Sequence, residues 1–198
     1  MSQVAVFPHD MDETWKLPSR GIVGIAWLIV AESSIFMIFV VAYIFYIGKS
    51  LSGPTPRDVL ELPIFTTICL LSSSFTVMRA VSFLEKSKTK LCSLWLAITI
   101  LLGAIFLAGT AREWHQLIYH DGLTIRTNLF GTTYYSLVGL HAFHVTVGLM
   151  GIVLVMIFAL LGKMQPAHSD RVDVFSMYWH FVDAVWVIVF TVVYFIGR

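Results

Sequence analysis

Charged residues are scarce in this chain. Asp, Glu, Lys and Arg together make up 13% of its 198 residues, whereas a soluble domain carries about 25%. Apolar residues reach 58%, and the mean hydropathy is +0.82. This scarcity leaves no room for a separate soluble domain, and a net charge of +1 without a basic cluster does not indicate a nucleic-acid partner. We predict one membrane-embedded domain over residues 1–198.

The chain has only two cysteines, and its first residues do not have the pattern of a cleavable signal peptide. The two cysteines, Cys69 and Cys92, fall in or at the ends of apolar segments and have no metal or redox spacing, so we interpret them as small buried apolar residues. Residues 1–20 contain five charges and no short apolar region before a small-residue cleavage site. We therefore expect the first membrane span to insert as a mature helix.

Alternating apolar and polar residues, the pattern of a membrane barrel, are absent as well. The chain instead has apolar runs long enough to cross a bilayer as helices, which takes about 20 residues. Helices satisfy their own backbone hydrogen bonds in lipid. The predicted fold is therefore all-α, a polytopic bundle of five transmembrane helices over residues 21–47, 63–84, 91–111, 132–162 and 175–197.

Lysine and arginine are unevenly divided between the two ends of these spans. Eight lie on the side of the N-terminus and five on the other side. Because positive residues favour the cytoplasmic side, we predict a cytoplasmic N-terminus and an outside C-terminus, in the inner (plasma) membrane of a bacterium.

Five ionisable residues interrupt the apolar spans: Glu32, His141, His144, His180 and Asp183. At about 1.5 Å per residue, Glu32 lies roughly 16 Å and Asp183 roughly 12 Å from the cytoplasmic edge, and the two histidines of the fourth span lie near the midplane. His180 and Asp183, three residues apart, share one helix face. Since such residues are costly in a membrane, they mark a functional site. The sequence predicts that they form one buried polar layer.

Three interpretations of this layer remain open. Each residue can simply form a hydrogen bond that holds helices together. The residues can hold a metal ion, although di-iron bundles use paired Glu-x-x-His elements and two further glutamates, and the layer has one glutamate. They can also form a proton relay or line a cavity for lipid or gas.

A second polar group follows the third span, where Glu113 and His115 form a predicted outer-side cluster beside Arg112 and Trp114. Its simplest interpretation is a solvated interface rimmed by aromatic residues. Gly148 and the nearby Gly151 in the fourth span predict a close helix contact.

Several of these segments resemble subunit III of the haem–copper terminal oxidases, in its short five-helix form. The segment Tyr178-Trp-His-Phe-Val-Asp-Ala-Val-Trp186 is similar to the last-helix signature of that family. The segment from Gly131 through His141 and His144 to Gly148 is similar to the helix before it. Glu113-Trp114-His115 and the buried Glu32 also match in order, and the resemblance covers the chain from Trp27 onward. Ala142 departs from the family pattern, which commonly has glycine there, and the two extra N-terminal helices of the seven-span form are missing.

The resemblance implies a subunit without redox centres, with no cofactor or metal of its own and no catalytic residue. The haem and copper would lie in partner chains, and the complex would reduce O2 to water and pump protons. The chain would pack against the catalytic subunit I, and against subunits II and IV, and would bind phospholipids. The polar layer would support proton uptake, and the candidate lipid headgroup contacts would be Arg79, His168 and Arg171.

Other functions remain as alternatives. A quinol oxidase would carry a similar subunit III, because the choice of electron donor lies in other subunits. An accessory subunit of a nitric oxide reductase shares the five-helix pattern. An independent proton-coupled transporter, or a membrane di-iron enzyme, would also place acids and histidines at mid-depth.

Overall fold

A computed structural model describes residues 20–50, 53–164 and 169–197, apart from the side chains of residues 169–171. Within those ranges the chain is helical and has no strand. Five helices are long and apolar enough to cross a membrane, which confirms the predicted fold class. They are α1 (Arg20–Tyr46), α3 (Ile64–Glu85), α4 (Thr89–Tyr119), α5 (Leu129–Leu160) and α6 (Ser169–Phe190), which continues as the π-helical turn η2 (Thr191–Ile196). A short helix, α2 (Pro56–Val59), lies between α1 and α3.

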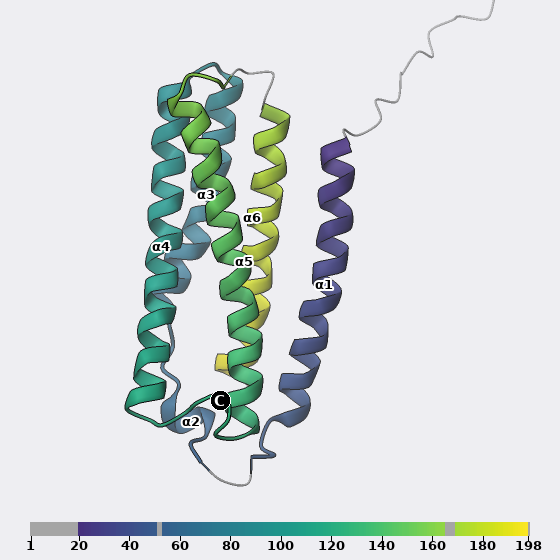
Figure 1. Ribbon diagram of the computed structural model, residues 1–198, viewed down its shortest axis with the longest axis vertical. Helices are drawn as coiled ribbons and strands as arrows, with labels where there is room; N and C mark the ends of the chain where they lie inside the picture. Colours follow the sequence, from purple (N-terminus) through teal and green to yellow (C-terminus); the bar gives the residue numbers. More distant parts are fainter. Residues whose placement is uncertain (1–19, 51–52, 165–168, 198) are drawn as a thin grey trace, which may run out of the picture.

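The helices run up and down in an antiparallel bundle (Figure 1). Helices α3 and α4 form a hairpin, α5 packs beside α4, and α6 packs against α3, α5 and α1. The main neighbours of α1 are α5 and α6, so α1 lies at one edge of the bundle (Figure 1). Two ends can be distinguished: α1 and α6 begin at one, and α2 lies at the other, which we call the α2 end.

Helix α4 is longer than its apolar run. The third span was predicted to end at residue 111, but α4 continues to Tyr119. The residues that follow, Arg112 to Tyr119, contain neither glycine nor proline and so keep the helix intact. The helix ends before Gly122, whose φ of +65° turns the chain, while the Leu123 N–H donates to the Leu117 carbonyl over 2.8 Å. The Glu113 region is therefore helical and lies against neighbouring helices.

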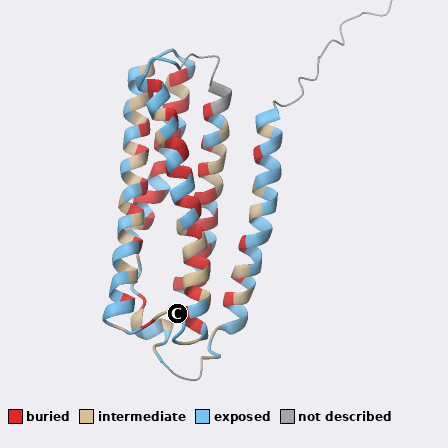
Figure 2. Cartoon of the chain, viewed as in Figure 1, coloured by how far each residue is buried: buried red, intermediate tan, exposed pale blue. Residues whose placement is uncertain are grey.

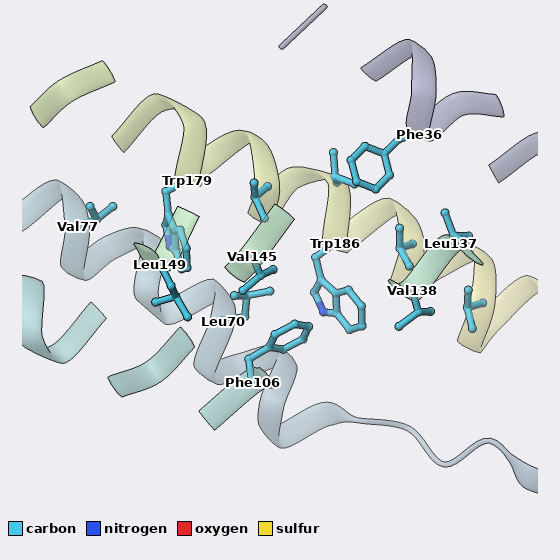
Figure 3. Packing of buried hydrophobic residues seen from close by; sticks show 14 of the residues in the cluster. Phe36, Leu70, Val77, Phe106, Leu137, Val138, Val145, Leu149, Trp179 and Trp186 are labelled. Atoms are coloured by element: carbon cyan, nitrogen blue, oxygen red, sulfur yellow. The ribbon is translucent and has the colours of Figure 1, made fainter. Parts of the chain in front are cut away.

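The bundle is held together by large aromatic side chains packed against glycine. Trp179 and Trp186 of α6 are almost fully buried, together with Phe106 of α4 (Figure 3). A Cβ atom on Gly148 would lie 2.9 Å from the indole of Trp179, and one on Gly151 would lie 2.9 Å from the ring of Phe175. Both distances are shorter than a normal van der Waals contact. The predicted close contact of the α5 glycines is therefore confirmed, and the helix that they contact is α6.

The outward faces of the bundle are apolar. Buried residues line the interior, whereas α1 is exposed over most of its surface (Figure 2). Trp27, Met37 and Ile38 of α1 are 61–71% exposed. In lipid this exposure carries no hydrophobic penalty, and helix association depends on close packing and hydrogen bonds. The polar contacts inside the bundle therefore carry more of its specificity than the apolar area does.

Two capped turns shape the α2 end. The carboxylate of Asp58 accepts hydrogen bonds from the Thr55 backbone N–H over 3.1 Å and from the Thr55 hydroxyl over 2.5 Å. These bonds hold the pKa of Asp58 below its usual value. Asn128 caps α5 by accepting from the Gly131 N–H over 2.8 Å, and its amide donates to the Pro54 carbonyl over 3.1 Å. The two loops are thereby joined.

Candidate functional site

The five ionisable residues of the predicted layer are distributed over three helices and form three separate arrangements. Glu32 of α1 contacts His144 of α5. His180 and Asp183 of α6 share a partner on α3. His141 of α5 lies among aromatic rings. The structure therefore divides the layer into two hydrogen-bonded groups and one apolar-packed histidine.

The Glu32–His144 pair joins α1 to α5. The His144 Nε2 atom lies 3.0 Å from Glu32 Oε2, and its Nδ1 atom lies 2.8 Å from the Leu140 carbonyl oxygen. A carbonyl can only accept, so Nδ1 must carry a proton. The Nε2–Oε2 contact then holds one further proton, which belongs either to the carboxyl group or to the imidazolium ring. Glu32 keeps 23% of its side chain exposed, on the α1 side of the bundle.

Ser74 of α3 connects the two ionisable residues of α6. Its hydroxyl donates to Asp183 Oδ2 and lies 2.9 Å from His180 Nδ1. Because a hydroxyl has a single proton, His180 Nδ1 must then donate to Ser74 Oγ. The opposite ring nitrogen of His180 lies 3.3 Å from the hydroxyl of Ser176. Asp183 is buried, and its other oxygen has no partner among the described residues.

Reasoning from the sequence did not identify Ser74. The signal was present, because Ser72, Ser73 and Ser74 stand together in the middle of an otherwise apolar span. Ser73 accepts the indole N–H of Trp179 over 2.8 Å. The adjacent serines thus bind successive parts of the α6 signature and fix its rotation against α3.

His141 is packed as an aromatic side chain. It is fully buried, and neither ring nitrogen has a hydrogen-bond partner in the described part of the chain. Its ring stacks on Trp186 at 4.9 Å and meets Phe106 edge to face at 5.8 Å. Trp186 is itself held by a hydrogen bond from its indole N–H to Thr67 Oγ1. His141 is therefore separated from the carboxylates that the sequence grouped with it.

Glu113 and His115 point in different directions. Glu113 Oε1 accepts hydrogen bonds from Tyr194 of η2 over 2.8 Å and from Tyr134 of α5 over 3.1 Å. His115 is exposed, and its ring lies 4.6 Å from that of Tyr119. Residues two apart on a helix differ by about 200° in direction. The predicted outer-side cluster is therefore split, and only Glu113 takes part in helix packing.

Of the three candidate lipid headgroup contacts, the structure describes the side chain of Arg79. Arg79 is exposed on α3, with its guanidinium 5.3 Å from the centre of the Phe83 ring. His168 lies outside the described residues, and so does the side chain of Arg171.

Metal binding was one interpretation of the polar layer. Within the described ranges, no three histidine, cysteine or acidic side chains are arranged to hold a metal ion. The two hydrogen-bonded groups instead suit proton sharing and helix attachment, since each acid is matched to a histidine or a hydroxyl group.

Known proteins are similar in sequence to this chain over most of its length. The sequence profile of the family described as "Cytochrome c oxidase subunit III" matches residues 19–198. Cytochrome c oxidase subunit 3 of Bacillus sp. (strain PS3) is 34% identical over 174 residues, covering 86% of this chain and 84% of that protein. Its counterpart in Synechocystis sp. is 35% identical over 185 residues, covering 89% and 76%.

A relative named for a different electron donor is also similar to this chain. The probable quinol oxidase subunit 3 of Staphylococcus saprophyticus is 31% identical over 170 residues, covering 84% of each chain. The profile match, these relatives and the five membrane-spanning helices all agree with the resemblance of the individual motifs. The chain belongs to the cytochrome c oxidase subunit III family.

Proposed function

We propose that this chain is the subunit III of a bacterial haem–copper respiratory oxidase that reduces O2 to water and pumps protons. The match to the family over residues 19–198 carries this proposal. The chain would contribute no redox centre, and the haem and copper would belong to partner subunits. It would pack against subunit I, with subunits II and IV in the same complex, and its N-terminus would face the cytoplasm.

The Glu32–His144 pair supports a role in proton handling. It holds one proton at mid-membrane depth, and its carboxyl group remains partly exposed at the α1 edge of the bundle. The shared proton can move between Oε2 and Nε2 without loss of the helix contact, because the hydrogen bond survives whichever of the two groups carries it. We infer that the pair sustains proton uptake by the neighbouring catalytic subunit during turnover.

The Ser74–His180–Asp183 group supports an architectural role. It joins α3 to α6 through partly buried hydrogen bonds that end on the buried Asp183. Such bonds hold the family signature in α6 in one rotational position. We infer that this group preserves the surface on which the other subunits assemble and on which phospholipids bind.

The electron donor of the complex remains a choice between cytochrome c and quinol. Relatives with both names are similar to this chain at comparable identity. The quinol oxidase is therefore the second candidate function.

Affinity purification of the tagged chain in a mild detergent tests the proposal. We expect haem absorbance and haem-bearing partner chains in the purified sample, with mass spectrometry of the native complex naming the partners. Oxidation of cytochrome c or of a quinol by that sample identifies the donor. Purification of the chain alone, with stoichiometric iron or with transport activity, would overturn the proposal.

A further inference from the structure

A cavity lies at the α2 end, away from the polar layer. Its volume is about 340 Å³. One wall comes from the segment that leads into α3, and the other comes from the last turns of α4. We call it the α3–α4 cavity. On the side of the membrane midplane, Gly109 of α4 lies so close to Thr66 that a Cβ atom would collide with the threonine methyl group.

The polar wall of this cavity presents charges of both signs. Glu61, Arg112, Glu113 and Gln116 all line it. The two tyrosine hydroxyls that bind Glu113 both donate to Oε1, which leaves Oε2 without a partner in the described part of the chain. The two hydrogen bonds to Oε1 therefore fix the position of Oε2 as well. Glu61, in the segment before α3, supplies a second carboxylate to the same cavity lining.

The other wall is apolar and faces the lipid. Ile64 and Phe65 line the cavity and are 55% and 70% exposed on the first turn of α3. A ligand that fits must therefore carry several N–H donors for the carboxylates, an anion for the Arg112 guanidinium and an apolar part beside Phe65. A phosphoethanolamine headgroup on a lipid meets all three requirements, because its primary ammonium has three donors and its phosphate can pair with arginine.

We propose that the α3–α4 cavity binds the headgroup of a phospholipid with a primary amine, held by Glu61 and Glu113 at the ammonium and by Arg112 at the phosphate. The proposal deepens the lipid-binding part of the proposed function and does not depend on the electron donor. A lysine side chain of a partner subunit fits less well, because it would satisfy the carboxylates and leave the guanidinium without an anion. A choline headgroup also fits less well, since its trimethylammonium has no N–H donor.

Lipid titration of the purified protein, with whatever partners it retains, tests the proposal. The protein is delipidated in detergent and titrated with phosphatidylethanolamine or with phosphatidylcholine of the same acyl chains, and bound lipid is counted by native mass spectrometry. The variants are Glu61→Gln, Glu113→Gln and Arg112→Gln. Glu85→Gln and Arg126→Gln serve as matched controls, because both side chains are exposed and neither lines the cavity.

We expect one phosphatidylethanolamine to bind roughly tenfold more tightly than phosphatidylcholine, since charge-assisted hydrogen bonds are lost with the choline headgroup. Glu61→Gln and Glu113→Gln should remove that preference. Arg112→Gln should weaken the binding of both lipids, because both carry the phosphate, and the controls should change neither the preference nor the affinity. Glu61 and Arg112 are exposed, so their variants decide the result if Glu113→Gln loses the subunit. Soluble phosphoethanolamine should compete only weakly, because the apolar wall favours the intact lipid.

Equal binding of the two lipids would overturn the proposal, and so would unchanged selectivity in Glu61→Gln or unchanged lipid affinity in Arg112→Gln. Strong competition by soluble phosphoethanolamine would show that the cavity binds the free headgroup, and would overturn the intact lipid as its ligand. A zero-length cross-link from Glu61 to a lysine of a partner chain would replace the lipid with a protein contact. Haem absorbance of the same sample reports on the proposed function separately, because it does not depend on which lipid is bound.

Discussion

His144 binds Glu32 with one ring nitrogen and the backbone of its own helix with the other. The first contact measures 3.0 Å between Nε2 and Oε2, and the second measures 2.8 Å from Nδ1 to the Leu140 carbonyl. The backbone contact fixes the orientation of the imidazole ring, much as an outer partner orients a metal-binding histidine. The carboxyl group of Glu32 is therefore held at one place between α1 and α5, whether the shared proton lies on the carboxyl group or on the imidazole ring.

Replacing Glu32 with glutamine should preserve assembly and impair proton-coupled turnover. The glutamine amide can still donate a hydrogen bond to His144 Nε2, but it cannot release a proton. We expect an unchanged haem spectrum, unchanged subunit content and a faster loss of oxidase activity during turnover. Glu85→Gln, an exposed glutamate in α3, is the control. Loss of the haem spectrum in Glu32→Gln would contradict this role.

Replacing Asp183 with leucine should weaken the attachment of α6. The change removes the acceptor of the Ser74 hydroxyl proton, at a cost of about 1–3 kcal/mol for a polar group left without its hydrogen bond. We expect a lower thermal midpoint and poorer retention of the subunit in detergent, and Asp183→Asn should recover most of both. Ala184→Leu places the same side chain at the exposed neighbouring position and should have little effect. Full retention of the subunit in Asp183→Leu would count against the architectural role of this group.

Replacing Gly148 with alanine should separate α5 from α6. The new methyl group would lie 2.9 Å from the Trp179 indole, which is held by Ser73 and cannot easily move. Overpacking of this kind costs about 1–3 kcal/mol. Gly24→Ala is the matched control, because a Cβ atom there meets nothing within 4 Å. Equal thermal midpoints for the two variants would show that the helix contact is looser than described.

Acidification should open the short helix α2. The pKa of Asp58 is lower in the folded protein than in an unfolded chain, where it would be about 3.8. The stabilisation is therefore present above the unfolded pKa and is lost as the pH falls through the folded pKa. We expect amide hydrogen exchange of residues 56–59 to rise at acid pH. Thr55→Val should reduce this pH dependence, because only the backbone N–H bond to Asp58 remains. Thr191→Val, at an exposed hydroxyl of η2, should leave it unchanged.

The helices and their approximate limits could be predicted from hydropathy because a lipid-embedded backbone has few alternatives to a helix. The extra turns of α4 were missed, since hydropathy marks the apolar run and not the end of the hydrogen-bonded helix. The close contact at Gly148 was predicted because glycine has no side chain, but its partner on α6, Trp179, was not predicted. Contact partners depend on helix rotation and order, which periodicity does not contain.

The amino-acid sequence alone determined the membrane class, the five spans and the family resemblance. It also identified the ionisable residues within the spans, whose burial in a membrane is costly enough to indicate a role. Only the tertiary structure decided how those residues combine. Depth along the membrane placed five ionisable groups in one layer, but depth is a single coordinate. Rotation of each helix separates Glu32 and His144 from the group around Ser74, and it leaves His141 against Trp186. That rotation is set by side-chain packing between helices distant in the chain, and no local sequence pattern specifies it.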